Sequence, residues 1–502
     1  MFDFQYPNSQ MPKINFLIKK GGENIIRSDR FILNTIKEFR CSKKRYEMLL
    51  GDAYYKGAHD ILKRKRSCIG EDGTIIEINN LPNNRIVDNQ YKKLVTQKVN
   101  YLLGKSFTID ADREYSNLLK NIFNSKFVKL LRNVCQDSIN CGIGWIYIYY
   151  DEEGNINFKK LNPWEVAAGW SDAEHTKLDY AIRFYESIEY EGENRKIKEK
   201  AEVFDNIGIR RYEIDKGRLI PDGIKWKTPY FYYKNNRLSW SKIPLIPFKY
   251  NEETPLIKNV KTLQDGLNLI ISNFQNAMEE DPRNTILVLK NYDGENLGEF
   301  RENLATYGAV KVRTIDGTDG GVETLSINVN SENYKSLIEI FKKAIIENGM
   351  GYDAKSEKLN GNPNMMNILS MYSDIDIDSI GMENEYRDAV ENIIWFINSH
   401  LCNTGKGNFF NEDVKIIFNK NILINESELI DNCIKSLNVI SEETVIAKHP
   451  WVEDSVKELK RIKKSKEKQY EEKTNGNGNK RGNCRRGSKS LQQGNNQTEG
   501  QS

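Results

Sequence analysis

Two amphipathic helices that bracket a short mixed segment constrain this chain more than any other feature of its sequence. The first is expected over 256–280, where apolar side chains recur every third or fourth residue: Val260, Leu263, Leu267, Ile270, Phe274 and Met278. That spacing gathers them on one face of a helix. A second helix is expected over 331–348, and between the two the pattern changes to strand, helix, strand, turn and strand. The sequence therefore predicts two antiparallel helices that carry a small α/β module at their tip.

A polar segment follows the second helix and separates it from a third, much longer one. Gly349-Met350-Gly351 ends the second helix, and the next residues up to 362 are mostly polar. Polar stretches bracketed by glycine are typical of mobile loops. Asn362 and Pro363 then have the residue types of an N-cap and a first helical turn. A long helix is therefore expected from there to about residue 402.

The rest of the chain alternates between helical and strand patterns, so the predicted fold class is α+β. In chain order, the predicted elements are helices over 31–66, about 85–104 and 116–140, an antiparallel sheet over 145–250 with a hairpin turn at Gly154, a strand pair over 413–424, and helices over 426–473. Residues 474–502 are rich in Asn, Gly, Gln and basic side chains. They have too few apolar side chains to offset the entropy of ordering, and disorder is predicted there.

Gly104-Lys105-Ser106 matches the end of a nucleotide-binding P-loop, but its context does not fit. A P-loop requires another glycine five positions before Gly104, and Val99 stands there. A P-loop also follows a strand and opens a helix. Here the apolar spacing up to Leu102 indicates a helix that ends. Gly104 is therefore predicted to end that helix in a left-handed conformation.

Signatures of catalysis and metal binding are weak throughout the chain. The four histidines are far apart, and the seven cysteines contain no Cys-x-x-Cys pair. Residues 374–379 alternate aspartate with isoleucine, but Ser379 stands where a calcium loop requires glycine, so a helix surface is expected. The sequence therefore predicts no catalytic residue, no metal site and no cofactor.

The overall charge and hydropathy exclude two further classes of protein. Lys and Arg number 74 against 71 Asp and Glu, a net charge of +3, which argues against a broad basic surface that grips nucleic acid. No apolar run reaches the roughly 18–20 residues that a membrane-spanning helix needs. Any contact with DNA would have to be local and weak, and no membrane contact is predicted.

The order of these parts resembles that of tailed-bacteriophage portal proteins, specifically the siphophage type of Gram-positive hosts. The resemblance covers most of the chain and rests chiefly on the series of helix, module, helix, loop and long helix over 256–402. It also rests on four shorter stretches: "YYKGAHDILKRKR", "NRIVDNQYKKLVTQKVNYLLGKSFTI", "NPWEV" and "IPLIPFKYNEE".

The resemblance implies an architecture of wing, helical stem, small α/β clip and helical crown. The implied parts are an N-terminal segment (1–45), a wing of helices and antiparallel sheet (46–250), a first stem helix (251–281), the clip (282–330), a second stem helix (331–348), a tunnel loop (349–362), a long wing helix with strands (363–425), the crown helices (426–473) and a disordered basic tail (474–502).

The resemblance also implies a function and a set of partners. Portal proteins form a ring, usually of twelve subunits, at one capsid vertex of the virion, after assembly in the host cytoplasm. The ring connects head and tail and conducts double-stranded DNA during packaging and ejection, without enzymatic activity. Expected partners are the terminase large subunit, a head-completion or adaptor protein, the scaffold and the major capsid protein. The alternative is a packaging component with enzymatic activity, an ATPase or a nuclease subunit, which would need a P-loop or an acidic metal site.

Five lysines are candidates for the wall of such a channel. Three lie on the second helix and two in the polar segment: Lys335, Lys342, Lys343, Lys355 and Lys358. In a ring, each would be repeated as a circle of positive charge that meets phosphates in weak, transient contacts. The competing interpretation for each is an ordinary lysine that faces solvent.

Overall fold

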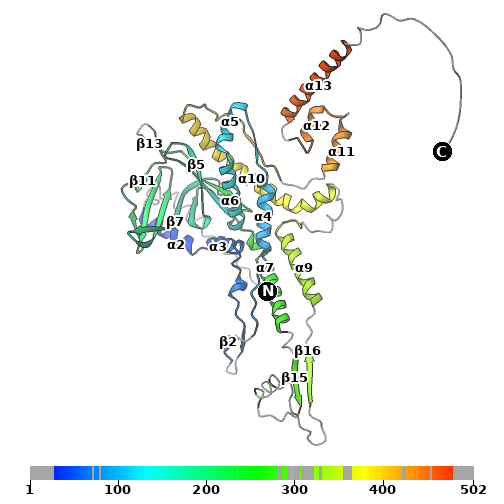
Figure 1. Cartoon of the computed structure of the whole chain (residues 1–502). Coiled ribbons are helices and arrows are strands. Elements are labelled where there is room, and N and C mark those ends of the chain that lie inside the picture. The colour runs from blue at the N-terminus through cyan, green and yellow to red at the C-terminus, as the bar shows by residue number, and fades with distance from the viewer. Residues whose placement is uncertain are drawn as a thin grey trace, which may run out of the picture. The chain divides into compact units, whose positions relative to one another are not determined.

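The computed structural model divides the chain into two compact units. The first comprises Met1–Ser356 and Ser370–Ile422, and the second comprises Glu357–Leu369 and Leu423–Ser502. The structure describes residues 28–69, 73–77, 81–233, 236–280, 285–290, 296, 298, 306, 321–326, 331–353, 365–420, 426–437, 439–452 and 455–478. Helices and sheets are both extensive in the first unit (Figure 1), which confirms the predicted α+β class.

The helices of the first unit often begin at a side-chain cap. They include α2 (Asp29–Arg40), α3 (Lys43–Tyr55), the 3-10 turns η2 (Asp60–Lys63) and η3 (Pro163–Glu165), α4 (Gln90–Leu103), α5 (Arg113–Ile122), α6 (Ser125–Cys141), α7 (Ile257–Glu280), α9 (Ser331–Asn348) and most of α10 (Met365–Asn403). Ser42 accepts a hydrogen bond from an N–H in the first turn of α3, and Asn124 does the same for α6. These caps split the predicted helices 31–66 and 116–140, because each starts a new helix.

Gly104 ends α4 as predicted, but its conformation differs from the prediction. The helix stops at Leu103, and Gly104 has φ −68° and ψ −34°, which is right-handed. The predicted left-handed ending is therefore wrong. The helix does precede the Gly-Lys-Ser stretch, so the strand-to-helix order of a P-loop is missing there.

The strands of 143–249 form two main sheets where the sequence predicts one. The smaller has the antiparallel order β14-β4-β5, from β14 (Leu245–Lys249), β4 (Ile143–Tyr150) and β5 (Ile156–Leu161). The larger has the order β10-β9-β8-β7-β6, and β11 also pairs with β9. Its strands are β6 (Val166–Trp170), β7 (Leu178–Glu191), β8 (Asn194–Phe204), β9 (Ile209–Asp215), β10 (Arg218–Pro221) and β11 (Lys227–Thr228). The turn η3 lies between β5 and β6, where the chain passes from one sheet to the other.

The main hydrophobic core lies where α3, α4, α6 and the smaller sheet meet. Trp145 on β4 and Leu131 on α6 are almost completely buried. The helices α3 and α6 cross at Gly51, where a Cβ atom would lie 1.9 Å from the backbone oxygen of Asn140. Only glycine fits at that crossing, because the obstacle is backbone.

A second core forms where α2 covers the larger sheet. Ile32 on α2 is fully buried, and the ring of Phe31 packs edge-on against Tyr180 of β7 at 5.4 Å. Phe39 packs in the same way against Phe184 at 6.0 Å. Part of the predicted N-terminal segment thus packs directly on this sheet.

Several two-stranded pairs complete the first unit. They are β1 (Ser67–Ile69) with β2 (Ile75–Glu77), β12 (Phe231–Tyr233) with β13 (Asn236–Leu238), and β3 (Thr108–Asp110) with β17 (Lys415–Ile417). The last pair differs from the predicted strand pair over 413–424, because β17 pairs with β3 from far earlier in the chain. Residues 421–425 lie outside the described part of the chain.

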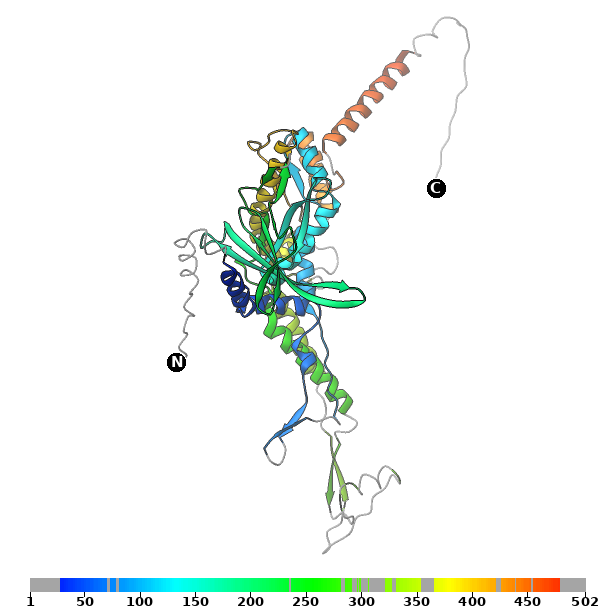
Figure 2. The same ribbon diagram turned by 90° about the vertical axis from the view of Figure 1, so that its left-hand side faces the viewer.

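The two amphipathic helices have almost the predicted bounds. α7 and α9 lie side by side in both views (Figures 1 and 2), and α9 covers the predicted residues 331–348. In the segment between them, β15 (Thr285–Lys290) pairs antiparallel with β16 (Gly321–Ser326), and both overlap predicted strands. The predicted inner helix and strand lie outside the described residues, apart from 296, 298 and 306.

The second unit contains α11 (Glu426–Ser436), α12 (Glu442–Lys448) and α13 (Ser455–Gly478). Ser441 caps α12, because its side chain accepts a hydrogen bond from Thr444 N. Val445 is buried, whereas Val439 and Trp451 are 82% and 71% exposed. The helix α13 continues five residues into the predicted tail, and 479–502 lie outside the described residues. Within the described ranges, no helix combines the length and the hydropathy of a membrane span.

Candidate functional site

The apolar stripes of α7 and α9 meet as the sequence predicts. The rings of Phe274 and Tyr334 lie 4.9 Å apart. Phe341 packs against Gly266, where a Cβ atom would come within 2.6 Å of its ring. Leu267 is fully buried in the same contact region. Gly266 therefore lets the two helices approach closely.

Other apolar side chains of this helix pair remain uncovered. Leu269 and Met278 on α7 are 42% and 49% exposed, and Leu337 and Ile340 on α9 are 43% and 60% exposed. Met278 belongs to the predicted stripe, yet this chain alone does not bury it. These side chains are available for contact with another protein.

A row of buried polar side chains runs along α7. Gln264, Asn268, Ser272 and Asn276 are spaced four residues apart, and each is 5% exposed or less. Their oxygens accept hydrogen bonds from backbone N–H groups of the segment 84–91, which we call the strap. The donors are the backbone N–H groups of Tyr91, Asp88, Ile86 and Asn84. They bond Gln264, Asn268, Ser272 and Asn276 in that order, at 3.0, 3.0, 2.9 and 2.7 Å. We call this row the polar ladder.

The polar ladder can form because the repeat distance along α7 nearly equals the repeat distance along the extended strap. Four residues of an α-helix rise about 6 Å, and two residues of an extended chain advance about 6.6 Å. Every second N–H of an extended chain points to the same side, so the N–H groups of 84, 86 and 88 meet successive turns of α7. Sequence analysis missed the ladder, because polar residues at spacing four are also what the solvent-facing side of an amphipathic helix shows.

The strap also contacts α9, through Asp88. The Asp88 carboxylate lies 2.8 Å from the Lys342 ammonium group. Its backbone carbonyl accepts a hydrogen bond from the Gln264 side chain at 2.7 Å. One residue of the strap therefore joins both helices of the pair.

His59 completes the buried polar network beside the ladder. It is 1% exposed, and its Nδ1 lies 2.8 Å from the amide nitrogen of Asn268. That amide nitrogen can only donate, so Nδ1 accepts, and the proton of the neutral ring lies on Nε2. Nε2 then donates to the backbone oxygen of Tyr54 at 3.0 Å. A proton on Nδ1 would face another donor.

Acidification is expected to weaken the fold through His59. Burial lowers the pKa of His59 below its usual 6.5. The unfolded chain therefore binds a proton more readily than the folded chain, so this stability is present above pH 6.5 and is lost progressively below it. The measurement is the thermal unfolding midpoint between pH 7 and pH 5. His59→Gln, which does not titrate, should show a smaller fall over that interval, and an equal fall would contradict the assignment.

The five candidate lysines differ in their surroundings. Lys342 is committed to Asp88, and Lys335 lies two helical turns earlier on nearly the same face of α9. Lys343 is 78% exposed at its side chain and lies 3.8 Å from Glu347 on its own helix. Lys355 and Lys358 lie outside the described residues.

The glycines after α9 serve close packing. A Cβ atom at Gly349 would lie 2.5 Å from a methyl group of Leu94, and one at Gly351 would lie 2.4 Å from the other methyl group. Met350, between them, has a positive φ of 48°. The residue with left-handed backbone is thus a methionine, while both glycines make room for α4. Residues 354–364 lie outside the described part of the chain.

The aspartate-rich stretch of α10 binds lysines of this chain. Asp376 lies 2.6 Å from Lys420, and Asp378 lies 2.6 Å from Lys98. The side chain of Asp378 is only 11% exposed, so the predicted helix surface is wrong at that position. Lys98, on α4, is 2% exposed and was not singled out by sequence analysis. Within the described residues, no group of three His, Cys, Asp or Glu side chains could hold a metal ion.

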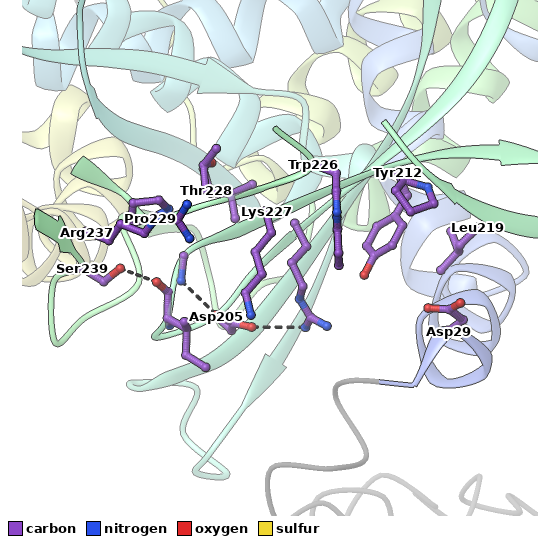
Figure 3. A pocket seen from close by; sticks show the side chains of 15 residues that line it. Asp29, Asp205, Tyr212, Leu219, Trp226, Lys227, Thr228, Pro229, Arg237 and Ser239 are labelled. Carbon is purple, nitrogen blue, oxygen red and sulfur yellow. Dashed lines mark hydrogen bonds and ion pairs between the residues drawn. The ribbon is translucent and has the colours of Figure 1, made fainter. Parts of the chain in front are cut away.

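A pocket of about 770 Å³ lies on the larger sheet (Figure 3). Tyr212 and Trp226 line it, together with Asp29 at the start of α2. Its buried Arg210 is paired with Asp205 at 3.2 Å. Neither histidine nor cysteine contributes to its lining. The lining therefore contains neither a Cys–His nor a Ser–His pair of nucleophile and base.

Comparison with known proteins shows which family this chain matches. The chain matches the family "Phage portal protein, SPP1 Gp6-like" over residues 37–472. It is 28% identical over 461 residues to the portal protein of Bacillus phage SPP1, with 90% of this chain and 89% of that protein aligned. It is 26% identical over 429 residues to the portal protein of Clostridium phage phiCD119, with 82% and 90% aligned.

Matches of this length define the class as phage portal proteins, the head-to-tail connectors of tailed phages. The chain belongs to the SPP1 Gp6-like portal family. The predicted resemblance to portal proteins from phages of Gram-positive hosts is thereby confirmed.

Proposed function

We propose that this protein forms a closed ring at one vertex of a phage capsid and conducts double-stranded DNA through its axis. The ring admits DNA during packaging and releases it during ejection. It docks the terminase large subunit, and later a head-completion or adaptor protein, without enzymatic activity of its own. The scaffold and the major capsid protein surround it during assembly in the host cytoplasm. Twelve subunits is the number that family resemblance favours.

The uncovered apolar side chains of α7 and α9 are the observation that carries this proposal. In a single chain, four apolar side chains of α7 and α9 stay about half exposed: Leu269, Met278, Leu337 and Ile340. Neighbouring copies of the same pair would bury them, and identical contacts repeated around an axis close into a ring. The family match supplies the same expectation independently.

We assign the described elements to the parts that the resemblance implies. In that assignment α7 and α9 are the stem helices, β15 and β16 belong to the clip, and α11 to α13 form the crown. The two main sheets, α3 to α6 and α10 make up the wing. Residues 349–362 form the tunnel loop, and 479–502 belong to the basic tail.

Among the lysines of α9, Lys343 is the one we propose for the channel wall. Lys342 is held by the strap through Asp88, and Lys335 shares its face. Lys343 points from an adjacent face and is largely exposed, so its ammonium group is available for brief contacts with phosphate. Lys355 and Lys358 of the tunnel loop are proposed for the same role.

An enzymatic packaging subunit is the competing function. It would need a nucleotide site or a metal site, and Val99 occupies the place of the P-loop glycine. The described residues also bring together no metal-binding cluster. The conduit is therefore the better supported proposal.

Cryo-electron microscopy of the purified full-length protein tests the proposal. We expect closed rings with an axial hole, with the exposed side chains of α7 and α9 buried between neighbouring copies. Lys343 should face the hole, and Lys342 should stay at Asp88. Monomers under all assembly conditions, or open stacks without a hole, would contradict the conduit. Rings in which Lys343 faces a neighbour would contradict only the assignment of the channel wall.

A further inference from the structure

Residues 349–353, the first five residues of the proposed tunnel loop after α9, form a tightly held segment that we call the root. The N–H groups of Gly349 and Gly351 donate to the carbonyls of Ile345 and Ile346, both at 2.9 Å. Gly349 and Gly351 lie against Leu94 of α4, with no space for a side chain of their own. The chain therefore leaves α9 along a fixed path.

Two consecutive residues of α4 hold the backbone of this root. The ammonium group of Lys98 donates to the Met350 carbonyl at 3.2 Å. The side-chain amide of Gln97 donates to the Tyr352 carbonyl at 2.9 Å. The root thus gives two of its backbone oxygens to α4, and one of the donors carries a full charge.

Lys98 also ties the root to α10. Its ammonium group lies 2.6 Å from the carboxylate of Asp378, and the Tyr250 hydroxyl donates to the other oxygen of that carboxylate at 3.1 Å. A buried lysine is tolerated only when its charge is paired and hydrogen-bonded. Lys98 meets this condition only while Asp378 and the root are both in place.

Aromatic rings make a second connection among the same three elements. The ring of Tyr352 lies 4.6 Å from that of Tyr372 on α10, and Tyr372 stacks at 5.8 Å on Tyr101 of α4. The root, α4 and α10 are therefore joined twice, once by a charge network and once by stacked rings.

We propose that Lys98 is a positioning residue for the tunnel loop. By holding the Met350 carbonyl and Asp378 together, it fixes the backbone of 349–353 and thereby the point at which the loop leaves α9. In a ring, every loop would then start at the same height and the same distance from the axis. The clamp itself follows from the contacts, and its use in DNA passage rests on the proposed function.

Hydrogen exchange of the full-length ring measures the clamp without reference to DNA. The variant combines Lys98→Met, Asp378→Leu and Tyr250→Phe, which replaces the whole polar group by apolar side chains and avoids an unpaired buried charge. We expect rings to form, and the amides of 349–353 to exchange about tenfold faster, the factor that loss of one charge-assisted hydrogen bond predicts.

The matched control removes a similar ion pair elsewhere in the first unit. Lys160 and Asp137 also lie 2.6 Å apart, and the Asp137 side chain is 7% exposed. The double variant Lys160→Met, Asp137→Leu should leave exchange at 349–353 unchanged. Unchanged exchange in the Lys98 variant as well would overturn the clamp. If the Lys98 variant does not fold, Gln97→Leu decides, because it too should speed exchange at the root, and no change would overturn the proposal.

DNA packaged per procapsid then tests the role of the clamp. We expect the Lys98 variant to package less DNA than both the wild type and the Lys160 control. Faster exchange with normal packaging would overturn Lys98 as a positioning residue for DNA passage, while the ring would stand. Failure of the wild type to form rings would instead contradict the proposed function, and the exchange result would still report on the clamp.

Discussion

Gly51→Ala is expected to destabilise the protein by about 3 kcal/mol, although alanine normally stabilises a helix. The added Cβ would lie 1.9 Å from the backbone oxygen of Asn140, where α3 crosses α6. Asn140 cannot withdraw easily, because it is 1% exposed and its side chain accepts a hydrogen bond from the Tyr91 hydroxyl at 2.9 Å. The two helices must therefore separate. The measurement is the free energy of unfolding from denaturant titration.

Gly381→Ala is the matched control for this substitution. Gly381 also lies inside a helix, α10, but a Cβ there meets nothing within 4 Å. Replacing it should stabilise the protein by about 1 kcal/mol, as helix propensity predicts. A Gly51→Ala variant as stable as the wild type would show that α3 and α6 do not cross so closely.

Asn268→Leu is the second substitution for which we expect a large effect, about 3 kcal/mol of lost stability. Asn268 is fully buried, and its oxygen accepts hydrogen bonds from Asp88 N at 3.0 Å and from the Gln264 amide at 3.1 Å. Leucine leaves the Asp88 N–H without this acceptor in a buried place, while the Gln264 amide keeps only its bond to the Asp88 carbonyl. It also removes the donor to His59. The strap should then separate from α7 at Asp88, whose hydrogen bond to Asn268 is lost.

Gln275→Leu serves as the control on the same helix. Gln275 is exposed, and its side chain bonds Glu279 of α7 itself at 3.1 Å. Its replacement should change the free energy of unfolding by no more than about 0.5 kcal/mol. Equal effects of the two substitutions would show that the ladder does not hold the strap. Hydrogen exchange at Ile86 and Asp88 would locate the change, because only Asn268→Leu should expose those amides.

The elements predicted best are those that repeat one signal over several turns. α7 begins at Ile257 and α9 covers Ser331–Asn348, both within one residue of the prediction. Each carries an apolar stripe over several turns, so the helical pattern does not depend on any single residue. Helix boundaries set by one polar side chain were missed, as at Ser42 and Asn124. Serine and asparagine also occur inside helices, so the residue type alone does not identify a cap.

The supports of the site depend on residues far away in the chain, and periodicity says nothing about those. Lys98 lies in an amphipathic helix where a lysine usually faces water, and only Asp378, 280 residues later, accounts for its burial. The same holds for Lys342, whose partner Asp88 lies in an extended segment that the sequence had wrongly assigned to the start of a helix. Sequence alone named Lys342 as a candidate but not Lys98, and it could not tell that either side chain was already engaged.

The end of α9 shows a further limit of reading single residue types. The two glycines around Met350 led to the prediction that the helix ends there and that a mobile loop begins. In the structure the methionine takes the left-handed backbone, and the glycines are needed because Leu94 occupies the space of their side chains. Glycine answers two different demands, conformational freedom and small size, and the sequence does not distinguish them.

The polar ladder also governs how these two segments can change in length. Losing one residue from the strap would turn its remaining N–H groups away from α7, and losing one from α7 would rotate the polar row by about 100°. Insertions and deletions can therefore be accommodated only as whole rungs, two residues in the strap together with four in the helix. The bonded residues are 173 to 192 positions apart. The parts of the gene that encode the strap and α7 are far apart, yet they can change in length only together.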